Sequence, residues 1–493
     1  MIKNLIALEI AIPILIGAAN FINRKRGLAY FLTLLTVTAS FVIAIMILLH
    51  SLTTPSISYH FGGWAPPIGI EFKITRLNAL FLVVVSSSAL LTFLYGKQIL
   101  FREIHKRKIS PFCSVFLICL AGLYGIILTN DFFNLYVFIE IASLATYALI
   151  SIGINRNAIQ AAFYYLIIGT IGATLILIGI GYLYIASGTL NIDDFIKNFA
   201  QIKHLKTVKL GYYLIFMGLF IKSGLFPFHS WLVKAYKNTN SFILPFLGSI
   251  STKVYILILL KLIYLSFGTE YILHNNILQP FLIVTGVLAI TVASIIALYQ
   301  KDLRSMLAFS SISQIGYIFI AISIGTKASM IAAIIFILSH IIAKMALFMV
   351  CGHIYYYKNT YNTEGLYMLF KEMPYTVVIF LINAASLIGI PLTFGFVGKI
   401  SLISSLIEQK MWFVLAAVVI ASFITFKYFW NFSEVFLFYK KYMPKEQAAT
   451  KIEVIETKFS IAPILVFTLL TFINIGLGLS FNKILLAAEK LLI

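Results

Sequence analysis

Residues 218–232 read GLFIKSGLFPFHSWL, an apolar stretch that contains a lysine and is then interrupted by glycine and proline. Flanking apolar residues extend it to 210–232, which is long enough to cross a bilayer as a helix. Pro227 lacks a backbone N–H and its ring clashes with the preceding turn, so we expect the helix to break there. The stretch therefore predicts a broken membrane-spanning helix with Lys222 near its centre.

Apolar runs of this length recur along the whole 493-residue chain. Hydrophobic residues make up 61% of the sequence and charged residues 11%, whereas soluble domains carry about 25% charged residues. We therefore predict an all-α polytopic membrane protein, a single bundle over residues 1–493 with about fourteen transmembrane helices. The runs lie at 4–22, 28–50, 77–97, 111–129, 132–153, 159–186, 210–232, 242–267, 279–299, 304–324, 329–356, 375–407, 411–438 and 460–487.

The connections between these runs are short and predict an orientation. The longest, Ser51–Arg76, alternates polar and apolar residues around Gly62-Gly63 and Pro66-Pro67, which indicates a surface hairpin. Lys and Arg gather in the odd-numbered connections, which the positive-inside rule places in the cytoplasm. We expect both termini and the hairpin to lie outside. The first run, Leu5–Ile22, lacks a small-residue cleavage site and is expected to be a retained helix.

The net charge of +20 is spread over these connections rather than gathered into a basic groove, so nucleic-acid binding is not expected. Cys113, Cys119 and Cys351 lie inside apolar runs without a CxxC or Cys/His cluster. The sequence also lacks phosphate-binding loops, dinucleotide-binding glycines and acidic metal-binding clusters. We therefore expect no cofactor, no metal ion, and no redox or hydrolytic site in this chain.

A weak internal repeat accompanies the broken helix. Residues 161–191 align without gaps with residues 332–362, and six positions are identical. The displacement corresponds to an odd number of runs, so the two copies would have opposite orientations in the membrane. The next run in each copy is interrupted, at Gly224–Pro227 and at Gly389–Pro391. Interrupted helices at matching positions of inverted repeats indicate a transport site.

Six charged residues occupy the middle of apolar runs, and each costs roughly 2.5–3.5 kcal/mol when left unpaired. They are Glu140, Lys222, Lys253, Lys344, Lys399 and, less centrally, Lys427. A row of titratable groups at this depth is typical of an ion or proton path. Glu140 lies about 14 Å along its helix, where it either pairs with a lysine of another helix or forms hydrogen bonds as a neutral acid.

Polar neighbours suggest how two of these lysines are accommodated. Lys253 follows Ser249 and Ser251-Thr252, whose hydroxyls we expect to bind its ammonium group. Lys344 lies four residues after His340 on one helix face, and two basic groups this close suit proton transfer rather than fixed charge.

Two of three further basic residues leave two interpretations open. His229 lies seven residues after Lys222, on roughly the same helix face, and is either a second proton carrier or a packed histidine at a helix end. Lys427 is either central or extends toward the membrane surface, and Lys261 is expected to extend in this way.

Four stretches together resemble a known family: LTNDFFNLYVFIEIASLATYALI (128–150), GLFIKSGLFPFHSWLVKAY (218–236), KDLRSMLAFSSISQIGYI (301–318) and GIPLTFGFVGK (389–399). The chain resembles the antiporter-like subunits shared by Mrp-type Na⁺/H⁺ antiporters, membrane-bound hydrogenases and respiratory complex I. The resemblance covers nearly the whole chain.

The resemblance implies two inverted five-helix repeats, formed by spans 4–8 and 9–13, with spans 7 and 12 broken. It implies that Glu140 pairs with Lys222 and that Lys253 connects this pair toward Lys399, with His340 and Lys344 between them. The expected parts are three N-terminal spans with the hairpin (1–109), a first repeat (110–267), a second repeat (279–438) and a C-terminal span (439–493).

The implied function is proton translocation within a multi-subunit complex in the cell membrane of a prokaryote. Expected partners are other membrane subunits, including homologous antiporter-like ones, with H⁺ as the carried ion, Na⁺ as a second candidate ion, and the lipid bilayer. Lys399 stands where one complex I subunit has glutamate, and no long lateral helix follows the final spans. Both features favour the D-type member of Mrp antiporters or its counterpart in hydrogenase and sulfur-reducing complexes. The alternatives are a proton-pumping subunit of an NADH/quinone oxidoreductase, a standalone cation/proton carrier, and a membrane anchor for a redox enzyme.

Overall fold

The computed structural model describes residues 2–23, 25–54, 56–153, 156–274, 277–438 and 461–490. Within these ranges, 12 helices are long and apolar enough to cross a membrane. They are α1 (Ile2–Ile22), α2 (Arg26–Ser51), α3 (Arg76–Glu103), α4 (Ile109–Leu128), α5 (Phe132–Ser151), α6 (Arg156–Ser187), the continuous segment Leu244–Phe267, α12 (Leu278–Leu298), α13 (Leu303–Ile324), α14 (Lys327–Lys358), α18 (Trp412–Leu437) and α19 (Ile461–Leu479). The protein is an all-α polytopic membrane bundle.

Two further apolar segments are interrupted helices. The seventh predicted run forms α8 (Lys206–Ser223) and α9 (Ser230–Asn238), and the twelfth forms α16 (Pro374–Ile388) and α17 (Phe394–Glu408). Gly224 and Gly389 end the first helix of each pair with φ of 71° and 87°, a left-handed conformation that glycine adopts without steric cost. The helices therefore break where the glycine–proline stretches stand in the sequence, while the total of about fourteen spans stays a prediction.

The segment Leu244–Phe267 is itself irregular. It consists of α10 (Leu244–Phe246), the π-helical turn η3 (Leu247–Ser251), α11 (Thr252–Lys261) and a second π-helical turn, η4 (Leu262–Phe267). A π-helical turn leaves backbone carbonyls without their usual helical partners and often marks a functional site. Both turns lie next to a lysine, Lys253 and Lys261 respectively.

The remaining elements lie at the ends of the bundle. The Ser51–Arg76 connection contains an antiparallel hairpin of β1 (Ile57–His60) and β2 (Glu71–Ile74), with His60 opposite Glu71. The shorter elements are η1 (Phe61–Gly63), η2 (Lys106–Lys108), α7 (Ile192–Ile202), η5 (Glu270–His274), η6 (Thr363–Gly365), α15 (Leu369–Glu372) and α20 (Phe481–Lys490). The last predicted run, 460–487, was too long, because α19 ends at Leu479 and the more polar α20 is a separate helix.

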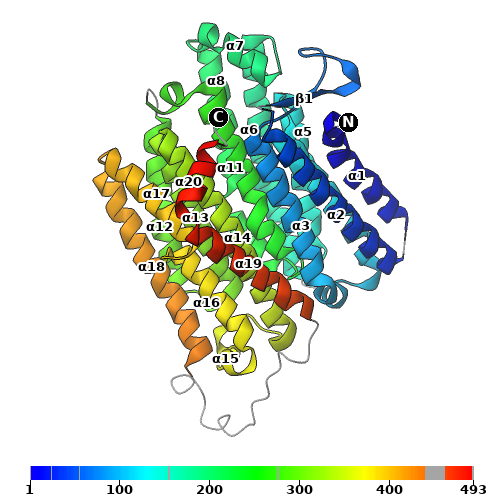
Figure 1. Ribbon diagram of the computed structural model, residues 1–493, viewed down its shortest axis with the longest axis vertical. Coiled ribbons are helices and arrows are strands. Elements are labelled where there is room, and N and C mark those ends of the chain that lie inside the picture. Colours follow the sequence, from blue (N-terminus) through cyan, green and yellow to red (C-terminus); the bar gives the residue numbers. More distant parts are fainter. Residues whose placement is uncertain are drawn as a thin grey trace.

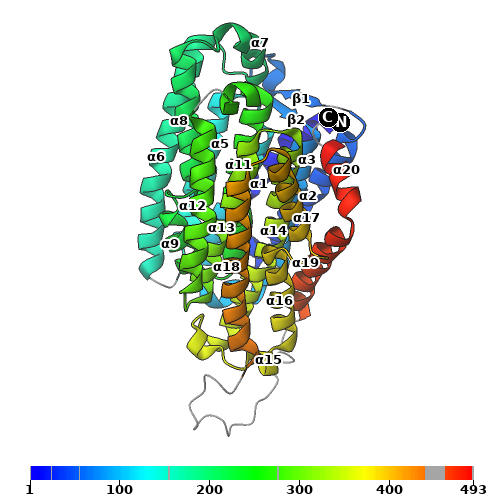
Figure 2. The ribbon, with the colours of Figure 1, turned by 90° about the vertical axis from the view of Figure 1, so that its left-hand side faces the viewer.

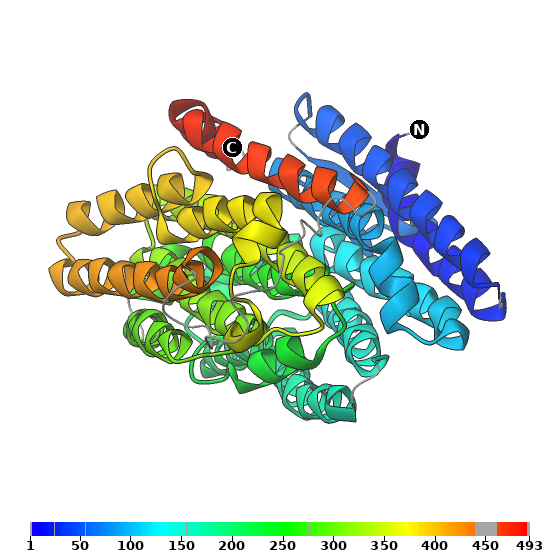
Figure 3. The same cartoon turned by 90° about the horizontal axis from the view of Figure 1, so that it is seen from below.

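Figures 1 and 2 show most long helices roughly parallel to one axis, with the hairpin and α7 at one end and α15 at the other. The end view in Figure 3 places α1 and α2 on one flank of the bundle and α16 to α18 on the opposite flank. Helix α19 crosses one side of the bundle between these flanks, at an angle to its neighbours (Figures 1 and 3). Helices α11, α13 and α14 lie between the two flanks and are almost entirely buried.

Glycines allow the closest helix contacts. A Cβ atom at Gly218 of α8 would lie 2.3 Å from the carbonyl oxygen of Gly172 in α6, and one at Gly179 would lie 2.6 Å from that of Gly211. In α13, a Cβ atom at Gly316 would lie 2.9 Å from the carbonyl oxygen of Gly286 in α12. Small residues drive helix association in membranes by letting backbones approach in this way.

Two connections on different parts of the chain are built alike. Asp131 caps the start of α5 and forms an isolated β-bridge with Asn191, while Asp302 caps the start of α13 and bridges to Asn362. The residue after each aspartate, Phe132 or Leu303, donates its N–H across the connection at 2.9 Å. The four residues are related by the same displacement as the aligned segments 161–191 and 332–362, as an internal repeat requires.

Candidate functional site

Lys222 lies in a polar cluster formed by α5, α8 and α11. Its side chain is fully buried, and its Nζ lies 3.9 Å from Glu140 Oε1 and donates to Ser143 Oγ at 2.7 Å. Ser143 is also 3.2 Å from the Tyr255 hydroxyl, and the Tyr147 hydroxyl lies 3.5 Å from the lysine. The structure thus brings Glu140 and Lys222 together, and it adds hydroxyl groups that the sequence had not indicated.

The local fold explains this position. Lys222 occupies the last turn of α8, two residues before the left-handed Gly224, where the carbonyl end of a helix favours a cation. Glu140 Oε1 forms no hydrogen bond within the described part of the chain, and its side chain is 21% exposed. The pair is therefore a loose ion pair rather than a closed one, and a change of about an ångström would make or break a direct hydrogen bond.

Lys253 is held by the first π-helical turn. It is fully buried, and its Nζ donates to the Gly248 carbonyl at 2.8 Å. The expectation that nearby hydroxyls bind this ammonium group was wrong for Ser249 and Ser251, whose hydroxyls donate to the carbonyls of Pro245 and Leu247. Both serines donate within their own helix, and the Lys253 ammonium group binds the Gly248 carbonyl instead of their oxygens.

His340 and Lys344 lie fully inside the bundle on α14. Lys344 Nζ donates to the Leu307 carbonyl at 2.7 Å and also to the Ser310 hydroxyl. Neither ring nitrogen of His340 has a hydrogen-bond partner among the described residues, and the residue is 1% exposed. His340 also interacts electrostatically with both Lys253 and Lys344. Buried imidazole nitrogens are rarely left unpaired, which distinguishes His340 from the packed residues around it.

Lys399 lies beside the break in the second interrupted segment. Its Nζ donates to the carbonyl of Ile388, the last residue of α16, at 2.5 Å and to Ser422 Oγ at 3.0 Å. It also lies 5.0 Å from the centre of the Tyr317 ring. A groove of about 430 Å³ between the interrupted segment and α18 reaches this lysine and is otherwise mainly apolar, with the exposed Phe423 on its wall.

The two residues with open interpretations lie apart from these contacts. His229 stacks on Phe226 at 5.0 Å, and the argument that placed it on the same face as Lys222 fails because α8 ends at Ser223. Lys427 lies on the exposed side of α18, close in sequence to the exposed Phe426 and Trp430. That position fits a lysine that extends toward the membrane surface.

One buried charge was missed by the sequence reasoning. Glu9 of α1 is fully buried, and neither of its carboxylate oxygens has a partner among the described residues. Its position inside the first apolar run, 4–22, could have identified it from the sequence as a charged residue within a membrane helix. The serines and tyrosine around Lys222 carried no such signal, since hydroxyl residues are common in membrane helices and their partners depend on how the helices meet.

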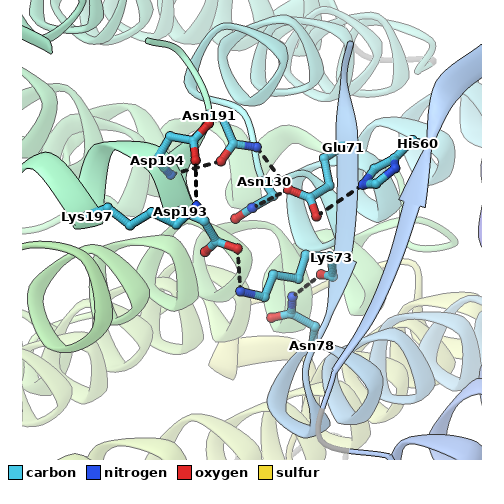
Figure 4. A network of polar contacts seen from close by, with 9 residues as sticks. All are labelled: His60, Glu71, Lys73, Asn78, Asn130, Asn191, Asp193, Asp194 and Lys197. Carbon is cyan, nitrogen blue, oxygen red and sulfur yellow. Dashed lines mark hydrogen bonds and ion pairs between the residues drawn. The ribbon is translucent and has the colours of Figure 1, made fainter. Parts of the chain in front are cut away.

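A second polar cluster lies where the hairpin meets α5 and α7 (Figure 4). Asn130 and Asn191 donate to Glu71 Oε2 at 2.8 and 2.9 Å, and His60 Nε2 lies 3.7 Å from Oε1. Burial raises the pKa of the Glu71 carboxyl, but hydrogen bonds from Asn130, Ser58 and Asn191 and the nearby His60 outweigh burial and hold that pKa below its ordinary value. Glu71 therefore ties the hairpin to the Asp131–Asn191 connection as a carboxylate.

The lysines Lys222, Lys253, Lys344 and Lys399 share one type of environment. Each donates to a backbone carbonyl or to a hydroxyl, and one of them, Lys222, also has a carboxylate in reach. Neutral oxygens stabilise an ammonium group without fixing its charge as tightly as a close carboxylate does. A buried set of amines bound mainly by neutral oxygens is the arrangement expected of an ion-conducting membrane protein.

Comparison with known proteins identifies the family. Residues 129–425 match the family model described as NADH:quinone oxidoreductase/Mrp antiporter, TM. The chain is 38% identical over 379 residues to NADH-quinone oxidoreductase subunit N of Desulforudis audaxviator, covering 76% of this chain and 74% of the relative. It is 29% identical to the putative antiporter subunit mnhD2 of Staphylococcus aureus, over 86% of this chain and 84% of that one.

A solved structure agrees with the sequence comparison. A chain of the membrane-bound sulfane sulfur reductase, an archaeal respiratory membrane complex, superposes with a TM-score of 0.85 at 27% identity, covering 99% of this chain and 97% of that chain. The protein belongs to the transmembrane family of NADH:quinone oxidoreductases and Mrp antiporters. It is an antiporter-like subunit of the kind found in multi-subunit membrane complexes.

Proposed function

We propose that this chain conducts protons through the membrane along Glu140, Lys222, Lys253, Lys344 and Lys399, with His340 as a relay. The observation that carries the proposal is the shared environment of the four lysines, each buried and bound mainly by neutral oxygens. A fixed structural ammonium group would be better served by a close carboxylate, and a solute carrier by one compact polar pocket. The inverted repeat would place the two helix breaks toward opposite faces of the membrane.

The switch in this path is the loose Glu140–Lys222 pair. At about 4 Å and an effective dielectric constant near 20, two opposite charges attract by about 4 kcal/mol. Doubling their separation halves this attraction, and about 2 kcal/mol corresponds to roughly a thirtyfold change in the equilibrium between charged and neutral lysine. A displacement of about 4 Å between the Glu140 carboxylate and the Lys222 ammonium group would therefore shift Lys222 from holding its proton toward passing it to Lys253.

The movement needs partners, since no redox or hydrolytic centre was expected from this sequence. The parent complex we favour is an Mrp antiporter or an ion-pumping hydrogenase or sulfur-reducing complex, with homologous antiporter-like subunits beside this one. The carried ion in this proposal is H⁺, with Na⁺ as a second candidate ion. We place the chain in the cell membrane of a prokaryote with the hairpin outside, which the distribution of Lys and Arg supports.

Transport by the purified complex in liposomes tests the proposal. Glu140→Gln and Lys222→Ala should each abolish ion exchange while the complex still assembles, and Lys427→Met, on the exposed side of α18, is the matched control. Normal exchange by both of the first two variants would refute the proton path. Full exchange by this chain alone would instead identify a standalone carrier.

A second candidate is a proton-pumping subunit of an NADH-quinone oxidoreductase. It is favoured by the 38% identity to subunit N of Desulforudis audaxviator. Both candidates use the same row of lysines, so the site cannot separate them. Identification of the subunits that copurify with this chain in mild detergent separates them, because one complex contains quinone-reducing subunits and the other does not.

A further inference from the structure

A cavity of about 290 Å³ lies under the hairpin, beside the C-terminal end of α11. Its polar lining comes mainly from β2, α7 and the starts of α3 and α5, and its apolar lining from α7 and α11 with the turn η4. Three charged residues reach it: Lys73, Asp193 and Lys261. None of them belongs to the row of lysines described above.

Lys261 is a basic residue without a hydrogen-bond partner. It is the last residue of α11, and no hydrogen bond or ion pair joins its Nζ to the described residues. It does interact electrostatically with Lys73 and Asp193. An ammonium group in a membrane helix requires water or a counter-ion, and the cavity provides space and polar groups for water, among them Thr129, Asn130 and Ser266.

An ion pair stands at the solvent side of this cavity. Lys73 Nζ lies 2.5 Å from Asp193 Oδ2, and the two side chains are 29% and 33% exposed (Figure 4). The backbone of Lys73 is also held in place, because its carbonyl accepts a hydrogen bond from Asn78 Nδ2 at 2.9 Å. Asp193 thus has two candidate partners, Lys73 at the surface and Lys261 inside, and it is paired with Lys73 here.

A π-helical turn lies beside Lys261, as another does near Lys253. A π-helical turn precedes Lys253 and supplies its carbonyl ligand, and another follows Lys261 directly, with Leu262, Leu265 and Ser266 on the cavity wall. Lys253 and Lys261 are eight residues apart on α11, or about 12 Å along its axis. That distance is far beyond hydrogen-bond reach, so the two amines cannot exchange a proton directly.

We propose that this cavity is a solvent mouth on the hairpin face of the membrane, where Lys261 exchanges protons with water and Asp193 is the gate. When Asp193 pairs with Lys73 the mouth is closed, and when it turns to a protonated Lys261 the mouth is open. The proposal rests on the proposed function, because it gives the proton path an additional opening. It concerns groups that the path itself does not use.

Cysteine accessibility in the intact complex tests the mouth. Lys261→Cys in sealed membranes should react with a membrane-impermeant, positively charged methanethiosulfonate added from the hairpin face and not from the other face. Leu260→Cys, its fully buried neighbour, is the matched control and should react far more slowly. Wild-type protein gives the background, since Cys113, Cys119 and Cys351 are all buried. Ser266→Cys, also on the cavity wall, replaces Lys261→Cys if that variant does not assemble.

The gate is tested by combining these cysteines with Asp193→Ala. A partly exposed ion pair changes an equilibrium about fivefold, so the modification rate should rise about fivefold. Asp194→Ala is the matched control, because it breaks the neighbouring pair with Lys197 (2.9 Å) on the same helix without touching the cavity. No modification from the hairpin face, or equal rates in the Asp193 and Asp194 variants, would overturn the proposal. Cysteine modification does not depend on transport, so its result tests the mouth separately from the Glu140→Gln experiment, which tests the proton path.

Discussion

The contact between α6 and α8 allows a quantitative test through Gly218→Ala. The new methyl group would lie 2.3 Å from the Gly172 carbonyl oxygen and 2.6 Å from Ile176 Cγ1. Because one of these atoms is backbone, the helices must separate by about 1 Å to restore ordinary contact. Overpacking of this kind costs about 1–3 kcal/mol, while alanine gains about 1 kcal/mol over glycine in a helix.

Gly181→Ala in α6 isolates the packing cost. Nothing lies within 4 Å of a Cβ atom at Gly181, so this variant gains helix propensity without overpacking. The difference between the two variants should therefore be about 1–3 kcal/mol, with Gly218→Ala the less stable. Denaturant titration and thermal melting of the complex in detergent measure this difference.

Gly218→Ala should also disturb the proposed switch, the Glu140–Lys222 pair. Gly218 lies one helical turn before Lys222, whose 2.7 Å hydrogen bond to Ser143 would be lost by a shift of this size. A hydrogen bond to a charged group contributes about 1.5–3 kcal/mol, so transport should fall at least about tenfold. Equal stability of the Gly218 and Gly181 variants, with normal transport in both, would refute the packing argument.

Three further outcomes are expected. Ser143→Ala removes the short hydrogen bond to Lys222 and should slow liposome transport about tenfold or more; an unchanged rate would contradict its role. Lys399→Met should abolish transport whereas Lys427→Met should not, and similar rates in the two variants would contradict the assignment of Lys399. The pKa of Glu71 is lowered in the folded protein, so its carboxylate stabilises the fold at pH values above the ordinary glutamate pKa of about 4.3, and this stability is lost as the pH falls. The melting temperature should therefore fall less steeply between pH 7 and 3.5 in Glu71→Gln than in the wild type. Parallel melting curves for the two proteins would exclude this contribution.

Local chemistry explains which features the sequence predicted well. The interruptions at Gly224 and Gly389 follow from residues that end helices wherever they stand, and both appear as left-handed helix ends. Lys222 and Lys253 were identified as buried because a charge within an apolar run must enter the bilayer with the helix that carries it. The predicted role of each site residue in transport is untested by geometry alone and stays a prediction.

Contacts between helices were harder to predict. That Ser143 binds Lys222, or Ser310 binds Lys344, depends on the rotation and depth of neighbouring helices, which no local pattern encodes. The prediction that His229 shares a helix face with Lys222 was wrong because it assumed one continuous helix. Helix α8 ends six residues before His229. Lys253 shows a third difference, since its ammonium group binds the Gly248 carbonyl rather than the serine hydroxyls close to it in sequence.

The carbonyl ligands of the buried lysines have a consequence for mutagenesis. Gly248, Leu307 and Ile388 supply main-chain oxygens, which remain whatever side chain replaces the native one. An alanine scan would therefore leave the Leu307 and Ile388 carbonyls in place, although each accepts a hydrogen bond from a buried lysine. A change in backbone chemistry, such as an amide-to-ester replacement, weakens such a ligand directly and would test its part in the proposed proton path.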